Sequence, residues 1–256
     1  MTTAPPLALV SGWGMPASLL APLGRMLGGS GAVAVPLPGH DGVPLSGAFD
    51  VAPVVAALLE QLPSDGVWVG WSLGGELLLE AAARRPPRAL VLIATTPRFT
   101  ASADWPHGVE PEALDALREA CEADPESARR RFLGLLASAG DGARAASREI
   151  RAAQQQAAPV DPAALTGGLD VLAALDLRER LGCVACPALW VMGGADPLMG
   201  VAGGNWAVSR MPAAAVACID GAGHAPLLSH ADACAAAIGA FLGQHVGLEW
   251  EYHGGR

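Results

Sequence analysis

A serine between two glycines is the clearest sign of chemistry in this chain. Ser72 lies in the run Gly70-Trp71-Ser72-Leu73-Gly74, which matches the pattern Gly-x-Ser-x-Gly. The apolar residues 67–71 before it are typical of a strand, and residues 73–85 after it carry the apolar stripe of a helix. Ser72 is therefore predicted on a sharp strand-to-helix turn, where glycines allow a strained backbone and the hydroxyl stands at the sheet edge. The alternative is a tight glycine-rich turn in an ordinary strand–helix unit.

A serine hydroxyl is a poor nucleophile unless a base removes its proton, and histidine is a suitable base. Among the six histidines, His224 has the most suitable position. It follows the last predicted strand in the run Gly221-Ala222-Gly223-His224-Ala225-Pro226, and the glycines let that loop turn the imidazole toward the sheet edge. The remaining histidines are expected at the surface or at helix ends: His40, His107, His230, His245 and His253.

The base needs a third group to orient it, and Asp196 is the candidate. Asp196 lies in Gly193-Gly194-Ala195-Asp196-Pro197, directly after the fifth predicted strand. An Asp before Pro is also common in plain turns and helix caps. However, Ser72, Asp196 and His224 occur in the chain order of the α/β-hydrolase triad, each at the end of a strand. We therefore predict a nucleophile, an orienting acid and a base at these three positions.

Acyl transfer through a serine also needs donors for the oxyanion of the tetrahedral intermediate. The backbone N–H of Leu73 follows the nucleophile at a helix N-terminus, which favours negative charge. The second donor is expected from the loop after the first strand, Ser11-Gly12-Trp13-Gly14, at the N–H of Trp13. The sequence contains no phosphate-binding glycine loop, dinucleotide fingerprint or cluster of metal ligands, so we expect neither a cofactor nor a metal.

The elements that must position these residues alternate along the chain. The expected strands are short, continuous apolar runs at residues 7–10, 32–35, 67–71, 89–94, 188–192 and 215–219. Helical patterns lie near residues 16–28, 50–62, 73–85, 201–211 and 230–243. Continuous apolar strands are typical of a parallel sheet buried on both faces. The sequence predicts an α/β fold with a mostly parallel sheet of about six strands flanked by helices.

One long stretch breaks this alternation. Residues 97–182 show helical patterns only, with Pro111, Pro125, Pro159 and Pro162 as expected helix starts or breaks. The core is then predicted from residues 1–96 and 183–256, and the insertion follows the fourth strand. Ligands of open α/β sheets bind beyond the carboxyl ends of the strands, so a helical insertion there is expected to cover the site as a lid.

Composition limits the class of protein and its partners. The chain has 256 residues, 52% of them hydrophobic, and a net charge of −9, which argues against nucleic acid as a partner. No apolar run is long enough for a membrane span, and Met1 to Pro6 lacks the features of a signal peptide. Cys183 and Cys186 form the only close cysteine pair and are expected to be buried thiols rather than zinc ligands. We expect a cytoplasmic monomer.

Further segments match a known family in the same order along the chain. They are residues 11–15, 70–75, 96–99 with 104–106, 131–133, 167–172 with 176–178, and 224–226 with 229–230. These residues resemble the α/β-hydrolase superfamily, and within it the carboxylesterases that hydrolyse the methyl ester of a pimeloyl chain on acyl carrier protein in biotin synthesis. The resemblance covers about residues 7–243 and includes the inserted segment, which varies widely between hydrolases of different substrate.

The resemblance implies roles for further residues. Phe132, Leu133, Gly134, Leu135 and Leu136 would line an acyl channel, although the same pattern suits the buried stripe of a lid helix. Arginines of the lid bind the acidic carrier in this family. The resemblance points to Arg131, Arg144 and Arg148 for this role. Arg151 shares a helix face with Arg144 and Arg148, because the three follow one another at spacings of four and three. An ordinary solvated face, with partners such as Glu149, is the alternative for this stripe.

Two other functions remain open at this stage. A general short-chain carboxylesterase or thioesterase would use the same triad on a free ester. A non-catalytic protein of the same fold would bind an acyl ligand or a carrier without turnover, but the complete set of Ser72, Asp196 and His224 argues against it. One carrier-binding arginine of the family falls on Ser127 here, which implies shifted or weaker docking of the carrier.

Overall fold

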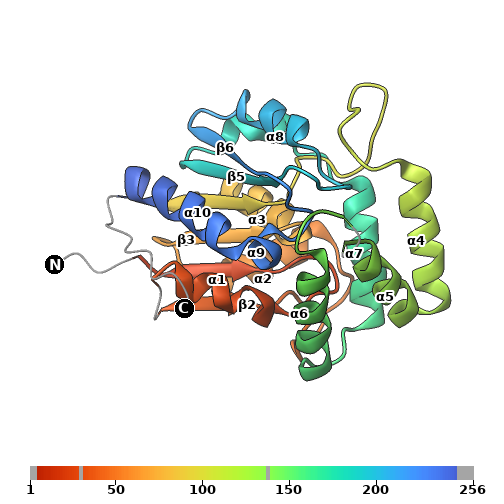
Figure 1. Ribbon diagram of the computed structural model, residues 1–256. Coiled ribbons are helices and arrows are strands. Elements are labelled where there is room, and N and C mark those ends of the chain that lie inside the picture. Colours follow the sequence, from red (N-terminus) through yellow and green to blue (C-terminus); the bar gives the residue numbers. More distant parts are fainter. Residues whose placement is uncertain (1–4, 29–30, 137–138, 247–256) are drawn as a thin grey trace.

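A single six-stranded sheet forms the centre of the molecule, and all its neighbouring strands are parallel. The structure, a computed structural model, describes residues 5–28, 31–136 and 139–246. Across the sheet the order is β2-β1-β3-β4-β5-β6 (Figure 1). The strands are β1 (Leu7–Val10), β2 (Ala32–Val35), β3 (Val67–Trp71), β4 (Ala89–Ile93), β5 (Ala188–Gly193) and β6 (Ala214–Ile219). The predicted fold class is confirmed, and each strand begins and ends within one residue of its predicted bounds.

Helices cover both faces of this sheet. α1 (Ala21–Met26) packs against α10 (Ala231–Val246) on one face, and α2 (Val51–Gln61) packs against α3 (Leu73–Arg84) on the other (Figure 1). α8 (Val201–Val208) packs on β5 and β6. Shorter helices are η1 (Ala17–Leu20), η2 (Arg178–Cys183) and α9 (Pro226–Ser229). In the described ranges, no helix is both long and apolar enough to cross a membrane.

The segment between β4 and β5 contains α4 (Pro111–Ala123), α5 (Pro125–Leu136), α6 (Ala143–Gln156) and α7 (Pro162–Ala174), which lie beside the carboxyl ends of the strands (Figure 1). Pro111, Pro125 and Pro162 each occupy the first position of a helix, where proline loses no hydrogen bond. Pro159 instead lies in the loop before α7. Asp161 caps α7 by accepting a hydrogen bond of 2.8 Å from the Ala163 N–H.

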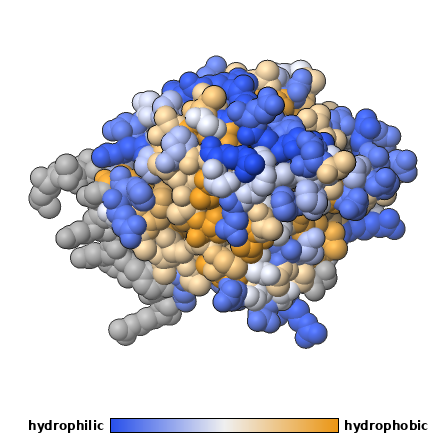
Figure 2. Space-filling model, turned by 90° about the horizontal axis from the view of Figure 1, so that it is seen from above, coloured by the Kyte–Doolittle hydropathy of each residue, from blue (hydrophilic) through white to orange (hydrophobic). Residues whose placement is uncertain are grey.

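Burial differs between the centre and the edges of the sheet. β1, β3, β4 and β5 are buried along their whole length, as predicted. The same prediction was wrong for the edge strands: Val33 in β2 is 59% exposed, and only Ile219 of β6 is buried. An edge strand has a neighbouring strand on one side only, so part of its surface stays exposed. Apolar surface accordingly reaches the exterior on the β6 side of the molecule (Figure 2).

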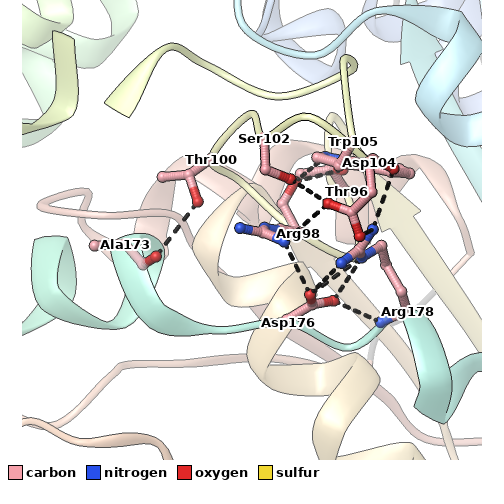
Figure 3. A network of polar contacts seen from close by, with 9 residues as sticks. All are labelled: Thr96, Arg98, Thr100, Ser102, Asp104, Trp105, Ala173, Asp176 and Arg178. Carbon is pink, nitrogen blue, oxygen red and sulfur yellow. Dashed lines mark hydrogen bonds and ion pairs between the residues drawn. The ribbon is translucent and has the colours of Figure 1, made fainter. Parts of the chain in front are cut away.

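A network of arginines and aspartates joins the two ends of the α4–α7 segment (Figure 3). Arg178 ion-pairs with Asp176 at 2.8 Å and with Asp104 at 3.0 Å, and Arg98 reaches Asp176 at 3.2 Å. Hydrogen bonding from Arg178 lowers the pKa of the Asp176 carboxyl. The Leu177 N–H also donates to the Pro97 carbonyl at 2.8 Å. The chain therefore leaves and re-enters the core at one cross-linked point.

Candidate active site

The turn between β3 and α3 carries Ser72 in a strained conformation, with φ of 56° and ψ of −127°. The strained backbone predicted for this turn lies on Ser72 itself. Those glycines are needed for close approach: a Cβ on Gly70 would lie 2.5 Å from the Gly75 Cα, and one on Gly74 would collide with the Ser11 carbonyl oxygen. The Ser72 N–H donates to the Ile93 carbonyl at 2.9 Å, which ties the turn to β4.

The three residues of the predicted triad meet at this turn. The Ser72 Oγ lies 3.0 Å from the His224 Nε2, and the His224 Nδ1 lies 2.8 Å from the Asp196 Oδ2. The side chains of His224 and Asp196 are completely buried. When the His224 Nδ1–H donates to the carboxylate, the Nε2 lone pair is left to accept the Ser72 proton. This arrangement can activate a serine hydroxyl.

Loops after β5 and β6 hold the acid and the base together. The Gly194 N–H donates to the Ile219 carbonyl and the Ala195 N–H to the Ala222 carbonyl, both at 2.9 Å. The second oxygen of Asp196 accepts the Leu198 N–H at 2.8 Å, so the carboxylate has a fixed orientation. Since β5 and β6 are parallel neighbours, their carboxyl ends deliver both loops to the same edge of the sheet.

Sequence reasoning missed two groups that support this arrangement. The Trp71 indole N–H donates to the His224 carbonyl oxygen at 2.8 Å, which fixes the backbone of the base. The Thr95 hydroxyl donates to the Ser72 carbonyl oxygen at 3.2 Å. Trp71 is part of the serine motif, but neither contact has a signal in the local sequence, because each joins segments far apart in the chain.

The other histidines lie away from this chain of hydrogen bonds. The expectation of a surface position was wrong for His40, which is 1% exposed and has its Nδ1 3.1 Å from the Pro38 carbonyl oxygen. Burial lowers the pKa of this imidazole. His107 and His230 are partly buried and His245 is exposed. His253 lies outside the described residues.

The loop after β1, residues 11–14, lies against Ser72 and is called the Trp13 loop below. A Cβ on Gly12 would be 3.1 Å from the Ser72 Cβ. Leu73 is the first residue of α3, so its N–H has no acceptor within the helix. In the part of the chain that the structure describes, neither the Leu73 N–H nor the Trp13 N–H donates to a protein acceptor. Both N–H groups thus lack an acceptor among the described residues, and both belong to segments that contact Ser72.

The residues expected to line an acyl channel are divided between several sides of α5. Phe132, Leu133 and Leu136 are buried, whereas Gly134 and Leu135 are exposed. Phe132 and Leu135 line an apolar cavity of about 220 Å³ together with Phe99, Val109, Ala113, Leu114, Leu117, Arg131 and Leu198. Leu133 and Gly134 instead face a separate cavity next to α6. A single channel lined by all five residues does not fit a helix, whose successive side chains point in different directions.

The arginines expected to bind a carrier lie at the surface. Arg131 on α5 and Arg144, Arg148 and Arg151 on α6 are all exposed. Among the described residues, none of these four guanidinium groups forms an ion pair, so Glu149 is not their partner. Arg151 lines a cavity of about 480 Å³ between α5 and α6, together with Glu126 and Arg129.

Glu76 is an unusual carboxyl group one turn after Ser72, and sequence reasoning did not single it out. It is 1% exposed, and neither of its carboxylate oxygens has a hydrogen-bond partner within the described residues. Burial raises the pKa of Glu76 well above its ordinary value. An acid inside the apolar run of α3 is visible in the sequence, but its lack of a partner is not.

The sequence is similar to a protein family and to individual proteins over most of its length. A sequence model described as the alpha/beta hydrolase family matches residues 7–237. The chain is 39% identical over 245 residues to a protein of Xanthomonas campestris pv. campestris strain B100, covering 93% of this chain and 95% of the relative. It is 38% identical over 242 residues to a protein of Aromatoleum aromaticum, covering 91% and 96%. Both relatives are named "Pimeloyl-[acyl-carrier protein] methyl ester esterase".

Solved structures with low sequence identity share the fold. An esterase from Exiguobacterium antarcticum superimposes with a TM-score of 0.82 at 16% identity, covering 94% of this chain and 93% of the other. An enol-lactonase from Burkholderia xenovorans LB400 gives a TM-score of 0.79 at 18% identity, covering 94% and 92%. At these identities the similarity shows the fold alone.

We expect the buried Glu76 to make the free energy of unfolding depend on pH. Because its folded pKa is raised, the carboxyl must take up a proton on folding once the pH exceeds its ordinary pKa of 4.5. Below that pH, Glu76 is protonated in both states and does not lower the free energy of unfolding. Above it, the free energy of unfolding falls by up to about 1.4 kcal/mol per pH unit, until the pH reaches the folded pKa. Glu76→Gln removes this loss, so we expect its free energy of unfolding, relative to the parent, to rise between pH 5 and pH 8.

Urea unfolding at several pH values measures this difference. Glu60→Gln, on the exposed side of α2, is the matched control and should show no comparable pH dependence. A Glu76→Gln variant whose stability relative to the parent is constant over this range would show that Glu76 is ionised in the folded protein.

Proposed function

The chain belongs to the alpha/beta hydrolase family and, within it, to the pimeloyl-[acyl-carrier protein] methyl ester esterases, and from this premise we propose its reaction and its site. It is a serine carboxylesterase that hydrolyses the methyl ester of a pimeloyl chain carried by acyl carrier protein. As the resemblance implies, this reaction frees a carboxylate for biotin synthesis.

The hydrogen-bond chain from Ser72 through His224 to Asp196 is the observation that carries the proposal. His224 Nε2 takes the Ser72 proton while the serine oxygen attacks the ester carbonyl, and Asp196 stabilises the imidazolium that forms. The imidazolium then gives its proton to the departing methoxy group, which leaves as methanol. His224 next removes a proton from water, which attacks the acyl-enzyme. As the bond between the acyl carbon and the Ser72 Oγ breaks, the imidazolium returns its proton to the Oγ, which leaves the free acid and the restored Ser72 hydroxyl.

The N–H groups of Leu73 and Trp13 are the proposed oxyanion donors. Neither N–H has an acceptor among the residues that the structure describes, and both belong to segments in contact with Ser72. The N-terminus of α3 adds a partial positive charge at the same place. Such donors act most strongly when they are fixed before the charge develops, because no reorganisation is then needed.

Residues 97–182 are the proposed lid over this site, on a core formed by residues 1–96 and 183–256. The apolar cavity beside Phe132 and Leu135 supports a role in holding the hydrocarbon part of the substrate. Leu198, which borders the same cavity, is also the residue whose N–H binds Asp196. The cavity therefore borders the loop that holds Asp196, which supports the proposed acyl site.

Docking of the acidic carrier is assigned to exposed arginines of the lid. Arg144, Arg148 and Arg151 follow one another along one face of α6, and Arg131 lies on the neighbouring α5. Within the described ranges these arginines form no ion pairs, which supports their availability to a charged partner. An acidic protein with a local stripe of arginines has a defined place to receive carboxylates or a phosphate.

Covalent labelling tests the chemistry. A fluorophosphonate should label the parent protein once per chain at Ser72, and Ser72→Ala should abolish both labelling and hydrolysis. His224→Ala should lose nearly as much, since only binding and oxyanion contacts then remain. Both are measured by mass spectrometry and by ester turnover. Undiminished hydrolysis by Ser72→Ala would rule out this serine as the nucleophile.

Substrate comparison tests the carrier. The double variant Arg144→Ala/Arg148→Ala should raise KM for the carrier-bound ester and leave turnover of a small free ester unchanged, because distant charges act on encounter and binding. The effect should weaken with salt, as exposed charges are screened over roughly 8–10 Å. Arg25→Ala/Arg88→Ala removes the same charge from the opposite end of the sheet and serves as the control.

If the double variant handles both substrates as the parent does, the stripe is a solvated face and the general carboxylesterase becomes the better account. Equal loss on both substrates would instead indicate a damaged lid.

A further inference from the structure

We propose that helices α5 and α7 hold the Trp13 loop, which carries one oxyanion donor, and that Arg129 on α5 is the positioning residue that keeps this loop in its working conformation. This inference rests on the proposed function, because it assumes that the Trp13 N–H binds the oxyanion. It gives the lid a role in stabilising the transition state, in addition to covering the substrate.

The Arg129 side chain lies directly on the Trp13 loop. Its Nη1 donates to the Gly14 carbonyl oxygen at 3.4 Å. Its aliphatic stem is packed against the same residue: a Cβ on Gly14 would lie 3.0 Å from the Arg129 Cδ and 3.2 Å from the Cγ. Gly14 also has a φ of 65°, which favours glycine. The arginine thus contacts the residue next to Trp13 through both its charge and its stem.

Arg129 is itself held in place. Glu126, one turn earlier on α5, accepts hydrogen bonds from Arg129 Nη2 at 2.6 Å and from Nε at 3.2 Å. The Arg129 side chain is only 12% exposed. An arginine fixed by a paired carboxylate and by packing loses little further freedom when it contacts the loop. Its guanidinium group is therefore held in a fixed position beside the Gly14 carbonyl.

Phe132 provides a second contact from the same helix. Its ring meets the Trp13 indole edge-on, with centroids 5.1 Å apart and an interplanar angle of 90°. Phe132 lies three residues after Arg129, so both side chains project from one side of α5. The helix therefore touches the Trp13 loop at two successive turns.

α7 holds the other side of the indole. The Trp13 Nε1–H donates to the Leu165 carbonyl oxygen at 2.7 Å, and both groups are buried. Gly168, one turn later, lets the helix approach the ring: a Cβ there would lie 2.6 Å from the Trp13 Cδ1. Near the end of α7, the Thr100 hydroxyl donates to the Ala173 carbonyl beside the Asp176–Arg178 network (Figure 3). The helix is thus anchored to the segment that leaves the core.

These contacts affect catalysis in a specific way. An oxyanion donor must lie within about 2.7–3.1 Å of the position that the charged oxygen will occupy. Loosening the Gly14 peptide displaces the neighbouring Trp13 N–H, which weakens binding of the transition state more than binding of the substrate. Loss of the Arg129 contact should therefore lower kcat and leave KM nearly constant.

Arg129→Met tests the proposal, because methionine keeps an unbranched apolar stem and removes the guanidinium group. Arg130→Met is the matched control: it changes the next residue of α5, which is exposed and forms an ion pair of 4.0 Å with Asp124. Turnover is measured on a small free ester, so that carrier docking does not contribute. Active sites are counted with a fluorophosphonate, so that a misfolded fraction does not alter kcat.

We expect kcat of Arg129→Met to fall about tenfold, less than the 10²–10³-fold loss that follows removal of a whole oxyanion donor. KM should change less than about twofold, and Arg130→Met should match the parent in both constants. The affinity for a trifluoromethyl ketone, which forms a charged tetrahedral adduct, should fall in proportion to kcat/KM.

Unchanged kcat in Arg129→Met, or a loss shared by Arg130→Met, would overturn the proposal. A rise in KM with constant kcat would also overturn it, since that pattern indicates a substrate contact. The proposed function fails separately, if the parent protein does not hydrolyse the ester or is not labelled at Ser72. Should Arg129→Met yield too few active sites, Arg129→Gln removes the charge and shortens the side chain, and the same fall in kcat is expected; an unchanged kcat in that variant would overturn the proposal.

Discussion

The strained backbone of Ser72 is the constraint on which the rest of the site depends. A serine with φ of 56° sits in a sparsely populated conformation that costs about 1–3 kcal/mol, so the surroundings must enforce it. They do so by dense packing: β3 is buried throughout, and α3 approaches β1 and β4 so closely that Gly74 and Gly75 leave no room for a Cβ. Packing of the core thus offsets the free-energy cost of the strained turn that holds the Ser72 hydroxyl above the sheet.

The parallel sheet then brings partners to that hydroxyl from distant parts of the chain. The loops after β1, β3, β5 and β6 all lie at the carboxyl ends of the strands, so one edge collects the Trp13 loop, Ser72, Asp196 and His224. The α4–α7 segment adds contacts to the first of these loops through α5 and α7. The α4–α7 segment and the core therefore meet at the loop to which we assign an oxyanion donor.

Sequence patterns predicted the features that depend on local chemistry. The strand bounds follow from continuous apolar runs, the starts of α4, α5 and α7 follow from proline, and the triad residues follow from their motifs at strand ends. The exposure of β2 and β6 was missed because it depends on the order of strands across the sheet, which local patterns do not contain. The burial of His40 and the contact between Arg129 and Gly14 were also missed, because each depends on segments that are distant in the chain. The division of residues 132–136 around α5 was foreseeable, because consecutive residues cannot share one face of a helix.

The central claim is that Ser72 is reactive because Asp196 holds His224 in the orientation and charge state that accept its proton. Replacement of Asp196 by Asn tests this claim most directly, since the amide is nearly the same size but cannot stabilise the imidazolium. Turnover of the ester by the folded variant is measured with active sites counted independently, for example by calorimetric titration with a substrate analogue. The account predicts a fall in kcat on the order of 10⁴-fold with the fold and the thermal transition retained. Turnover within a few fold of the parent would contradict it and would require another group to orient the base.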